Sequence, residues 1–255
     1  MLWFESVAVA YFAALTGTAC LLKPRTVNSW RAAVSSATTA AAILLIVQIA
    51  PFAARAWLGH AYLVAGYFIP SILVAGRQPG TFEAWLVRSE DWWERWRVPL
   101  PRLAAVAVEL SYLLCYVLVP AAFLVVFLAG TRADIDRFWT AVLVSAFACY
   151  GTLPWLIARP PRAIAAAREA QEGSLHGMNV LVLTRVSHGH NTFPSGHVAV
   201  STAAAVVVCG VVTLAGAALL VISAGIAVGA TAGRYHYTID VVLGALIGSG
   251  VALII

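Results

Sequence analysis

A histidine and an aspartate stand four residues apart near the end of the chain. His236 and Asp240 belong to the segment Arg234-Tyr235-His236-Tyr237-Thr238-Ile239-Asp240, which leads into an apolar run. Residues four apart share one face of a helix. A carboxylate inside an apolar segment needs a partner. If His236 is that partner, Asp240 fixes its tautomer and leaves the other ring nitrogen free to act as a nucleophile. The alternative is a buried pair that only joins two helices.

A second histidine follows a helix-start sequence. Pro194-Ser195-Gly196-His197 opens another apolar segment. Proline and serine are typical of the first positions of a helix, and glycine permits close approach of a ligand to the backbone. The free N–H groups at a helix start favour bound anions. The pattern therefore predicts an anion site beside the His197 imidazole; a capped helix with an interfacial histidine is the alternative.

An arginine pair completes the set of charged groups. Arg159 and Arg162 flank two prolines at the end of an apolar segment. Guanidinium groups bind phosphate oxygens in bidentate fashion, so the pair is suited to clamp an anion. Arginines at the ends of membrane spans also contact lipid headgroups, which is the alternative for each one singly. Together the three clusters predict a phosphate site with a nucleophile.

The composition indicates a membrane protein. Of the 255 residues, 62% are hydrophobic and 11% are charged, against roughly 25% charged residues in soluble domains. The formal net charge is +5. The basic residues are scattered between apolar segments, so we expect contact with a bilayer and no nucleic-acid binding. The four cysteines have no metal-ligand spacing, and we interpret them as small core residues.

Eight apolar segments are long enough to approach a membrane span. We therefore predict an all-α, polytopic helical bundle with about eight transmembrane helices. The expected segments are residues 3–22, 33–50, 60–76, 103–129, 137–158, 197–214, 216–232 and 238–255.

Two longer connections have distinct compositions. Tryptophans and charges alternate near residues 80–97, which predicts a helix lying in the membrane interface. The loop 158–196 is rich in Pro, Gly, His and Arg, and its length favours a functional role. With eight spans, this loop and residues 233–237 lie on the same face of the membrane, opposite the two termini.

The three clusters resemble the motifs of the type 2 phosphatidic acid phosphatase superfamily, which includes vanadium haloperoxidases and inositol-phosphorylceramide synthases. Pro194 to His197 matches the second motif, and His236 with Asp240 matches the centre of the third. The first motif usually has a lysine where Thr152 stands, and the third an arginine where Ala230 stands. The Pro-Pro-Arg sequence and the short third motif look more like the inositol-phosphorylceramide synthase branch. The resemblance implies a six-helix core over residues 59–255, with two additional helices in residues 1–58.

The resemblance also implies a mechanism. His236 would attack phosphorus and form a phosphohistidine, Asp240 would orient it, and His197 would protonate the leaving group. The phosphate oxygens would be held by Arg159, Arg162, Ser195, Gly196 and Arg234. No metal or other cofactor is expected, and we interpret His188 and His190 as loop residues rather than zinc ligands.

These roles favour a hydrolase acting on a lipid phosphate or polyprenyl pyrophosphate. A phospho-headgroup transferase is the second hypothesis, because only the acceptor differs. A non-enzymatic anion-binding transporter or scaffold is the third. The oligomeric state is left open.

Two arguments about the side of the membrane that the site faces lead to opposite answers. Most Lys and Arg residues fall on the motif-bearing face, which by the positive-inside rule would be cytoplasmic. Several of these arginines serve phosphate binding or are balanced by acidic neighbours, and members of the resembled family usually face away from the cytoplasm. We therefore expect a plasma (inner) membrane protein with an extracytoplasmic site.

Overall fold

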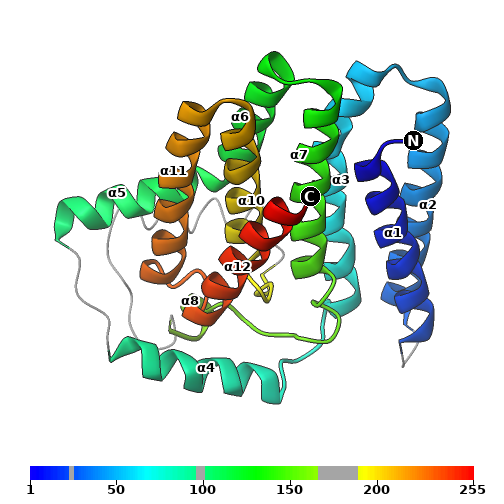
Figure 1. The fold of residues 1–255 in the computed structure, drawn as a ribbon. Helices are drawn as coiled ribbons and strands as arrows, with labels where there is room; N and C mark the ends of the chain where they lie inside the picture. The colour runs from blue at the N-terminus through cyan, green and yellow to red at the C-terminus, as the bar shows by residue number, and fades with distance from the viewer. Residues whose placement is uncertain (23–25, 96–100, 166–188) are drawn as a thin grey trace.

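The computed structural model describes residues 1–22, 26–95, 101–165 and 189–255. These residues form helices and no strands (Figure 1), which confirms the all-α prediction. The helices are α1 (Trp3–Leu21), α2 (Val27–Ile49), α3 (Phe52–Val74), α4 (Thr81–Glu94), α5 (Arg102–Leu113), α6 (Cys115–Ala129), α7 (Arg132–Tyr150), α8 (Pro161–Ala165), α10 (Gly196–Val211), α11 (Thr213–Ala232) and α12 (Thr238–Ile254).

Each predicted apolar segment overlaps a helix, but the helices differ in length and in the number of charged residues that they carry. Within the described residues, α1, α2, α3 and α11 are long and apolar enough to cross a membrane. A fifth span arises if α5 and α6, bent by 58° to one another, count as one. Helices α10 and α12 have 16 and 17 residues, or about 25 Å at 1.5 Å per residue. The polytopic bundle is confirmed, while eight spans remain a prediction.

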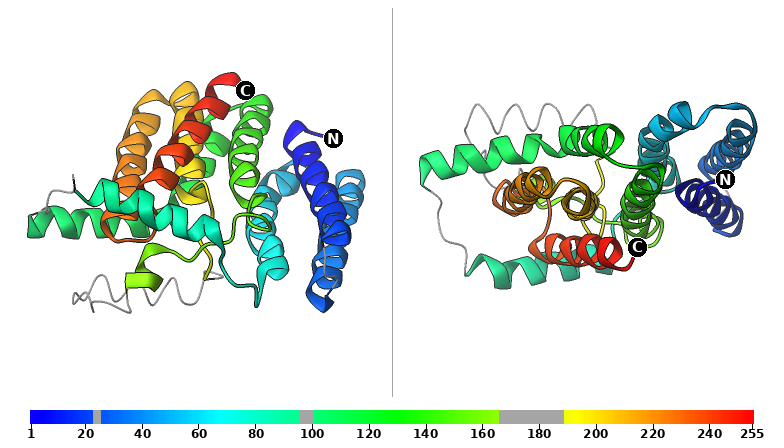
Figure 2. Two further views of the ribbon diagram at one scale, coloured as in Figure 1. Left: turned by 90° about the horizontal axis from the view of Figure 1, so that it is seen from below. Right: turned by 45° about the horizontal axis from the view of Figure 1, so that its top comes forward.

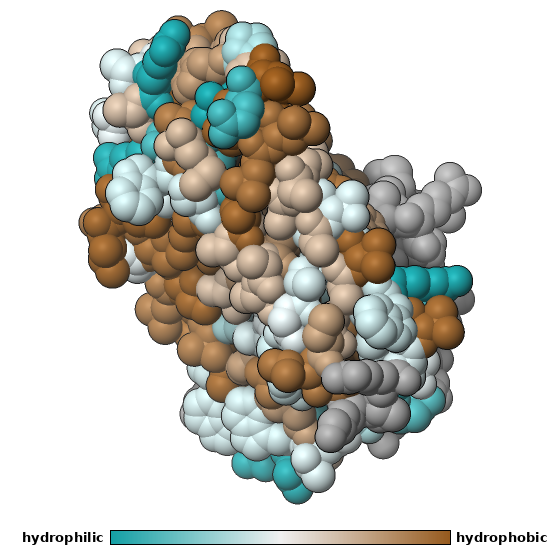
Figure 3. All heavy atoms as spheres, turned by 90° about the vertical axis from the view of Figure 1, so that its right-hand side faces the viewer, coloured by the Kyte–Doolittle hydropathy of each residue, from teal (hydrophilic) through white to brown (hydrophobic). Residues whose placement is uncertain are grey.

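The surface agrees with a bilayer environment. Large hydrophobic side chains such as Trp30, Leu45 and Val221 are exposed. Figure 3 shows hydrophobic residues over much of the middle of one face, with hydrophilic residues mainly toward its two ends. Contiguous exposed apolar surface of this kind is unfavourable in water and favourable in lipid.

Helix α10 lies at the centre of the C-terminal part. It contacts α6, α7, α11 and α12 (Figure 2, right). The contact with α12 is close because α12 presents Gly244 and Gly248 to it. A Cβ atom at Gly248 would lie 2.2 Å from the carbonyl oxygen of Ala199, and one at Gly244 would lie 2.5 Å from that of Ser195. Small residues at such positions let helix backbones approach in membranes, and here they bring the starts of α10 and α12 together.

The N-terminal helices are joined to the bundle by polar contacts. The Asp136 carboxylate in α7 accepts hydrogen bonds from the Trp3 and Phe4 N–H groups at the start of α1, at 3.1 and 3.0 Å. The buried Glu5 forms a bidentate ion pair with Arg55 of α3, at 2.7 and 2.6 Å. These bonds satisfy free N–H groups of α1 and pair a buried charge.

Helix α4 occupies the predicted interfacial region and runs across one end of the bundle (Figures 1 and 2). Trp85 and Trp92, seven residues apart, are exposed, while Leu86 is fully buried. Trp96, part of the same predicted segment, lies outside the described residues. Helix α8 and the starts of α10 and α12 lie at the same end as α4 (Figure 1), so the motif segments share one end of the molecule.

Candidate active site

His197 and His236 lie side by side. Their ring centroids are 5.7 Å apart and the ring planes make an angle of 61°. His197 is in the first turn of α10, and His236 is in the turn between α11 and α12. The Ser195 N–H donates to the Asp240 carbonyl oxygen at 3.0 Å, which joins the two segments directly. Two imidazoles distant in sequence thus share one site.

The Asp240 carboxylate is fully buried between these segments. Its Oδ2 accepts hydrogen bonds from the Asn191 amide at 2.6 Å and from the Tyr237 N–H at 3.2 Å. His236 Nδ1 lies 3.5 Å from the same oxygen, which is longer than a normal hydrogen bond. The predicted pairing is therefore a close contact, and Asn191 is the nearer partner. Asn191 stands three residues before Pro194 but is not among the predicted site residues.

The two histidines line a narrow pocket of about 20 Å³ with Arg162. The Arg162 guanidinium lies over the Tyr235 ring, 5.4 Å from its centroid, and the backbone N–H of Arg162 donates to the Arg234 carbonyl at 2.9 Å. The Arg162 side chain therefore lines the same pocket as the two imidazoles. The other residues that line the pocket are Tyr67, Tyr112, Pro160, His190, Asn191, Thr192 and Tyr235.

The side chain of Tyr235 anchors this part of the site. Its ring stacks on Tyr112 with centroids 4.2 Å apart, and its hydroxyl donates to the Glu109 carboxylate at 2.9 Å. Glu109, an acidic residue inside an apolar segment, thereby has a partner in the third motif.

The structure does not bring Arg159 and Arg234 into this pocket. Arg159 forms a bidentate ion pair with Glu83 of α4, at 3.1 and 2.8 Å. Arg234 pairs with Glu94 of α4 at 3.2 Å. Both side chains are partly exposed. Of the three predicted phosphate-binding arginines, only Arg162 lines the pocket.

Ser195 and Gly196 lie next to the pocket without lining it. The Ser195 side chain is fully buried. A Cβ atom at position 196 would lie 2.3 Å from the Tyr150 ring, so glycine is needed there for packing against α7. The Ser195 N–H is bonded to the Asp240 carbonyl, and phosphate binding by Ser195 and by the Gly196 N–H remains a prediction.

Buried polar atoms without a hydrogen-bond partner concentrate at this site. Among the described residues there are nine such side-chain atoms, and five belong to Asn191, Ser195, His197, His236 and Asp240. Unsatisfied buried polar atoms are rare in cores and call for an explanation. A pair that merely joined two helices would have its hydrogen bonds satisfied, so this concentration favours a site that binds a polar ligand.

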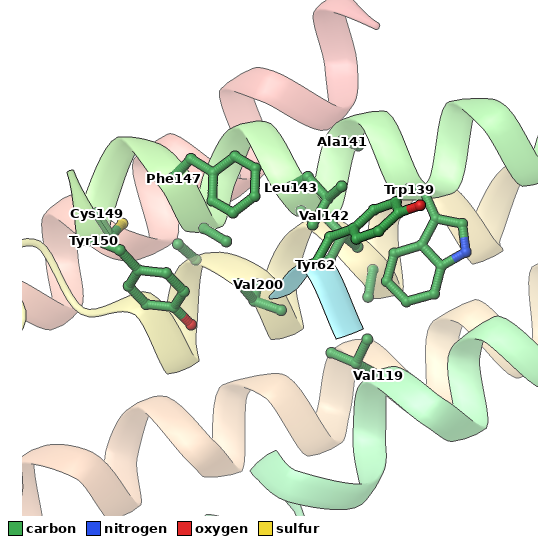
Figure 4. Packing of buried hydrophobic residues seen from close by; sticks show 14 of the residues in the cluster. Tyr62, Val119, Trp139, Ala141, Val142, Leu143, Phe147, Cys149, Tyr150 and Val200 are labelled. Atoms are coloured by element: carbon green, nitrogen blue, oxygen red, sulfur yellow. The ribbon is translucent and has the colours of Figure 1, made fainter. Parts of the chain in front are cut away.

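A second, apolar cavity of about 420 Å³ adjoins the pocket. Tyr67 and His197 line both. The cavity walls come from α3, α6, α7 and α10. Figure 4 shows three wall residues on three of these helices, namely Val119, Tyr150 and Val200. From Tyr67 it extends along α3 to His60, a distance of about 10 Å at 1.5 Å per residue. No sequence motif marks this cavity, because its lining residues are ordinary apolar and aromatic positions.

The two positions that depart from the family pattern have structural roles here. The Thr152 hydroxyl donates to the Phe193 carbonyl and so holds the second motif segment. The Ala230 carbonyl accepts from the N–H groups of Tyr235 and His236, each at 2.9 Å. Both positions therefore help to fix the segments that carry the histidines.

Within the described residues, no three His, Cys, Asp or Glu side chains are grouped so as to hold a metal ion. His190 lines the pocket, whereas His188 lies outside the described residues.

His236 has an unusually low pKa. Burial and, secondly, the nearby Arg162 charge lower the pKa of His236 from 6.5 to about 3. The imidazole is therefore neutral over the physiological range, as a nucleophilic nitrogen requires.

Comparison with known families agrees with the site geometry. The family model of the PAP2 superfamily matches residues 138–255, a range that contains both histidines, Asp240 and Arg162. The match supports the type 2 phosphatidic acid phosphatase superfamily predicted from the motifs. No curated protein and no solved structure matches the chain.

The low pKa of His236 predicts a pH-dependent stability. Folded His236 stays neutral while the unfolded chain binds a proton below pH 6.5, so the contribution is complete above pH 6.5 and is lost as the pH falls toward 3. The loss is about 1.4 kcal/mol per pH unit in that window. We expect His236→Gln to reduce the fall in the free energy of unfolding between pH 7.5 and 4.5, measured by denaturation in detergent. Identical pH dependence in both proteins would contradict the assignment.

Proposed function

We propose that the protein is a membrane-embedded hydrolase that removes phosphate from a lipid phosphate or polyprenyl pyrophosphate through a phosphohistidine. The observation that carries the proposal is the junction at His197 and Tyr67, where the pocket with the histidines and Arg162 meets the apolar cavity. A phosphorylated lipid needs both environments side by side. A cavity of this size lies within the usual range for small-molecule sites.

The proposed reaction has two steps. The Nε2 atom of His236 attacks phosphorus, because Nδ1 faces Asp240. The N–P bond forms as the P–O bond to the lipid breaks, and His197 gives its proton to the leaving oxygen. Water then loses a proton to His197 and attacks phosphorus, which breaks the N–P bond. The Arg162 guanidinium stabilises the charge on the phosphoryl oxygens in both steps.

Helix α4 keeps Arg159 and Arg234 in ion pairs, so we give the main phosphate-binding role to Arg162. Ser195 and Gly196 support it through the N-terminus of α10. We retain residues 59–255 as the catalytic core and residues 1–58 as an addition, with α1 bound to α3 and α7.

The proposal predicts turnover of lipid phosphates by the purified protein. We expect phosphate release that vanadate inhibits and that His236→Ala and His197→Ala each reduce by at least about 100-fold, the usual scale of a catalytic acid or base. Phosphate release on a panel of phosphorylated lipids measures this. A product with a new headgroup would support the transferase, and an absence of turnover with every lipid would support a non-enzymatic anion-binding protein.

The apolar cavity predicts a dependence on the lipid chain. Val200 lines the cavity one turn after His197, so Val200→Phe fills part of it. We expect this variant to lower kcat/KM about 10-fold for a long-chain lipid phosphate and to leave kcat/KM for a short, water-soluble phosphate ester unchanged. The reason is that only the long chain loses apolar contacts in the cavity, worth about one to two kcal/mol. Val221→Phe, at an exposed position of α11, is the matched control. Equal losses on both substrates would refute chain binding in the cavity.

We further propose that the site faces away from the cytoplasm in the plasma membrane. Helix α12 starts at the site and leads away from it toward the C-terminus (Figure 1), and we take it to be a span that carries the C-terminus to the other side of the membrane. A C-terminal reporter active only in the cytoplasm should therefore be active. A reporter active only outside would place the site in the cytoplasm, as the excess of basic residues on the motif-bearing face suggests.

A further inference from the structure

Helix α4 presents three carboxylates to the motif segments. Glu83, Glu90 and Glu94 are separated by seven and four residues, which places them on one face of the helix. Glu83 pairs with Arg159 of the first motif, and Glu94 pairs with Arg234 of the third. This face thus points toward the segments that carry the motifs.

The same helix also contacts the second motif. The Phe82 and Trp85 rings lie against Phe193, with centroids 5.0 and 6.2 Å from it. Phe193 immediately precedes the Pro-Ser-Gly-His sequence. Helix α4 therefore touches all three motif segments, which an anchor for the membrane surface alone would not need to do.

Glu90 makes the most buried of these contacts, with only 7% of its surface exposed. Its carboxylate accepts hydrogen bonds from the Thr238 N–H at 2.7 Å and from the Thr238 hydroxyl at 3.1 Å. Thr238 is the first residue of α12. The N–H groups in the first turn of a helix lack partners within the helix, and a carboxylate there is favoured by the helix dipole.

The bonds to Thr238 affect the catalytic carboxylate. The start of α12 offers the N–H groups of Tyr237 and Thr238, and Asp240 already accepts from the first. Glu90 accepts from the second, so each of these N–H groups has its own carboxylate, while Asp240 Oδ2 also accepts from Asn191 and lies 3.5 Å from His236 Nδ1. Without Glu90, Asp240 would be the nearest carboxylate in sequence for both N–H groups.

From these contacts we infer that Glu90 is a positioning residue for the reaction: it holds the first turn of α12 so that Asp240 and His236 keep their orientation toward His197. Glu90 itself does not touch the substrate. The inference rests on the proposed function, since it concerns how the nucleophile of that reaction is held.

The test compares variants at both ends of the contact. In Glu90→Gln one carbonyl oxygen still accepts from the Thr238 N–H, but the charge is lost; Glu90→Ala removes both bonds. Thr238→Val keeps the N–H bond and removes the hydroxyl bond at nearly constant shape. Asp91→Asn is the matched control, because Asp91 is the exposed neighbour on the same helix.

We expect kcat to fall about 10-fold in Glu90→Gln and about 100-fold in Glu90→Ala, the scale reported for small misplacements of reacting groups. KM should stay within about twofold, since the pocket and cavity residues that bind substrate are unchanged. Glu90→Asp should recover part of the activity, and Asp91→Asn should behave like the wild type. The double variant Glu90→Gln/Thr238→Val should lower kcat by less than the product of the two separate fold-losses, because both substitutions act on the same contact.

Two results would overturn the inference. One is a Glu90→Ala protein with wild-type kcat and only a lower unfolding temperature, which would make Glu90 a structural anchor. The other is a double variant Glu90→Gln/Thr238→Val whose loss of kcat equals the product of the two separate losses. This result decides the question if Glu90→Ala does not fold. Failure of the proposed function appears separately, as a wild-type protein that releases no phosphate from any lipid.

Discussion

The arrangement of the site depends on the burial of one carboxyl group. Asp240 is fully buried in a largely apolar bundle, where an unpaired charge or an unsatisfied polar atom is costly. Its partners come from both motif segments: the Asn191 amide, the Tyr237 N–H, the nearby His236 ring and, through its carbonyl oxygen, the Ser195 N–H. Because Asp240 accepts hydrogen bonds from Asn191, Tyr237 and Ser195, the segments that carry His197 and His236 are held together. The convergence of the two imidazoles follows from these bonds.

The rest of the fold makes that meeting possible. Gly244 and Gly248 let α12 approach α10 until backbone atoms almost touch, and α4 holds the outer side of the same turn through Glu90. Aromatic rings of Tyr112 and Tyr235 cover the other side. The result is a neutral, buried imidazole beside the Arg162 guanidinium, open to an apolar cavity through His197. The polar pocket and the apolar cavity thus lie next to each other, with Tyr67 and His197 lining both.

Parts of this account could be predicted from the sequence and parts could not. The apolar segments, the existence of a helix near residues 80–97 and the proximity of His197 to His236 follow from composition and from motifs whose spacing has few physical interpretations. The pairing of Arg159 and Arg234 with α4 does not, because an arginine has the same sequence signal whether it faces a phosphate or a carboxylate. Asn191 and Glu90 act through contacts 49 and 148 residues away in the chain, and local patterns carry no information at that range. The starts of α10 and α12 agree with the predicted segments to within one residue, whereas α10 ends at Val211, three residues before the predicted end.

The central claim is that His236 becomes covalently phosphorylated, and it can be tested directly. Protein mixed with a lipid phosphate labelled at phosphorus is quenched in alkali, where phosphohistidine persists, and the labelled peptide is located by mass spectrometry. The account predicts label on His236 and none in His236→Ala. Label on a different residue, or continued phosphate release by a protein that never carries label, would contradict it.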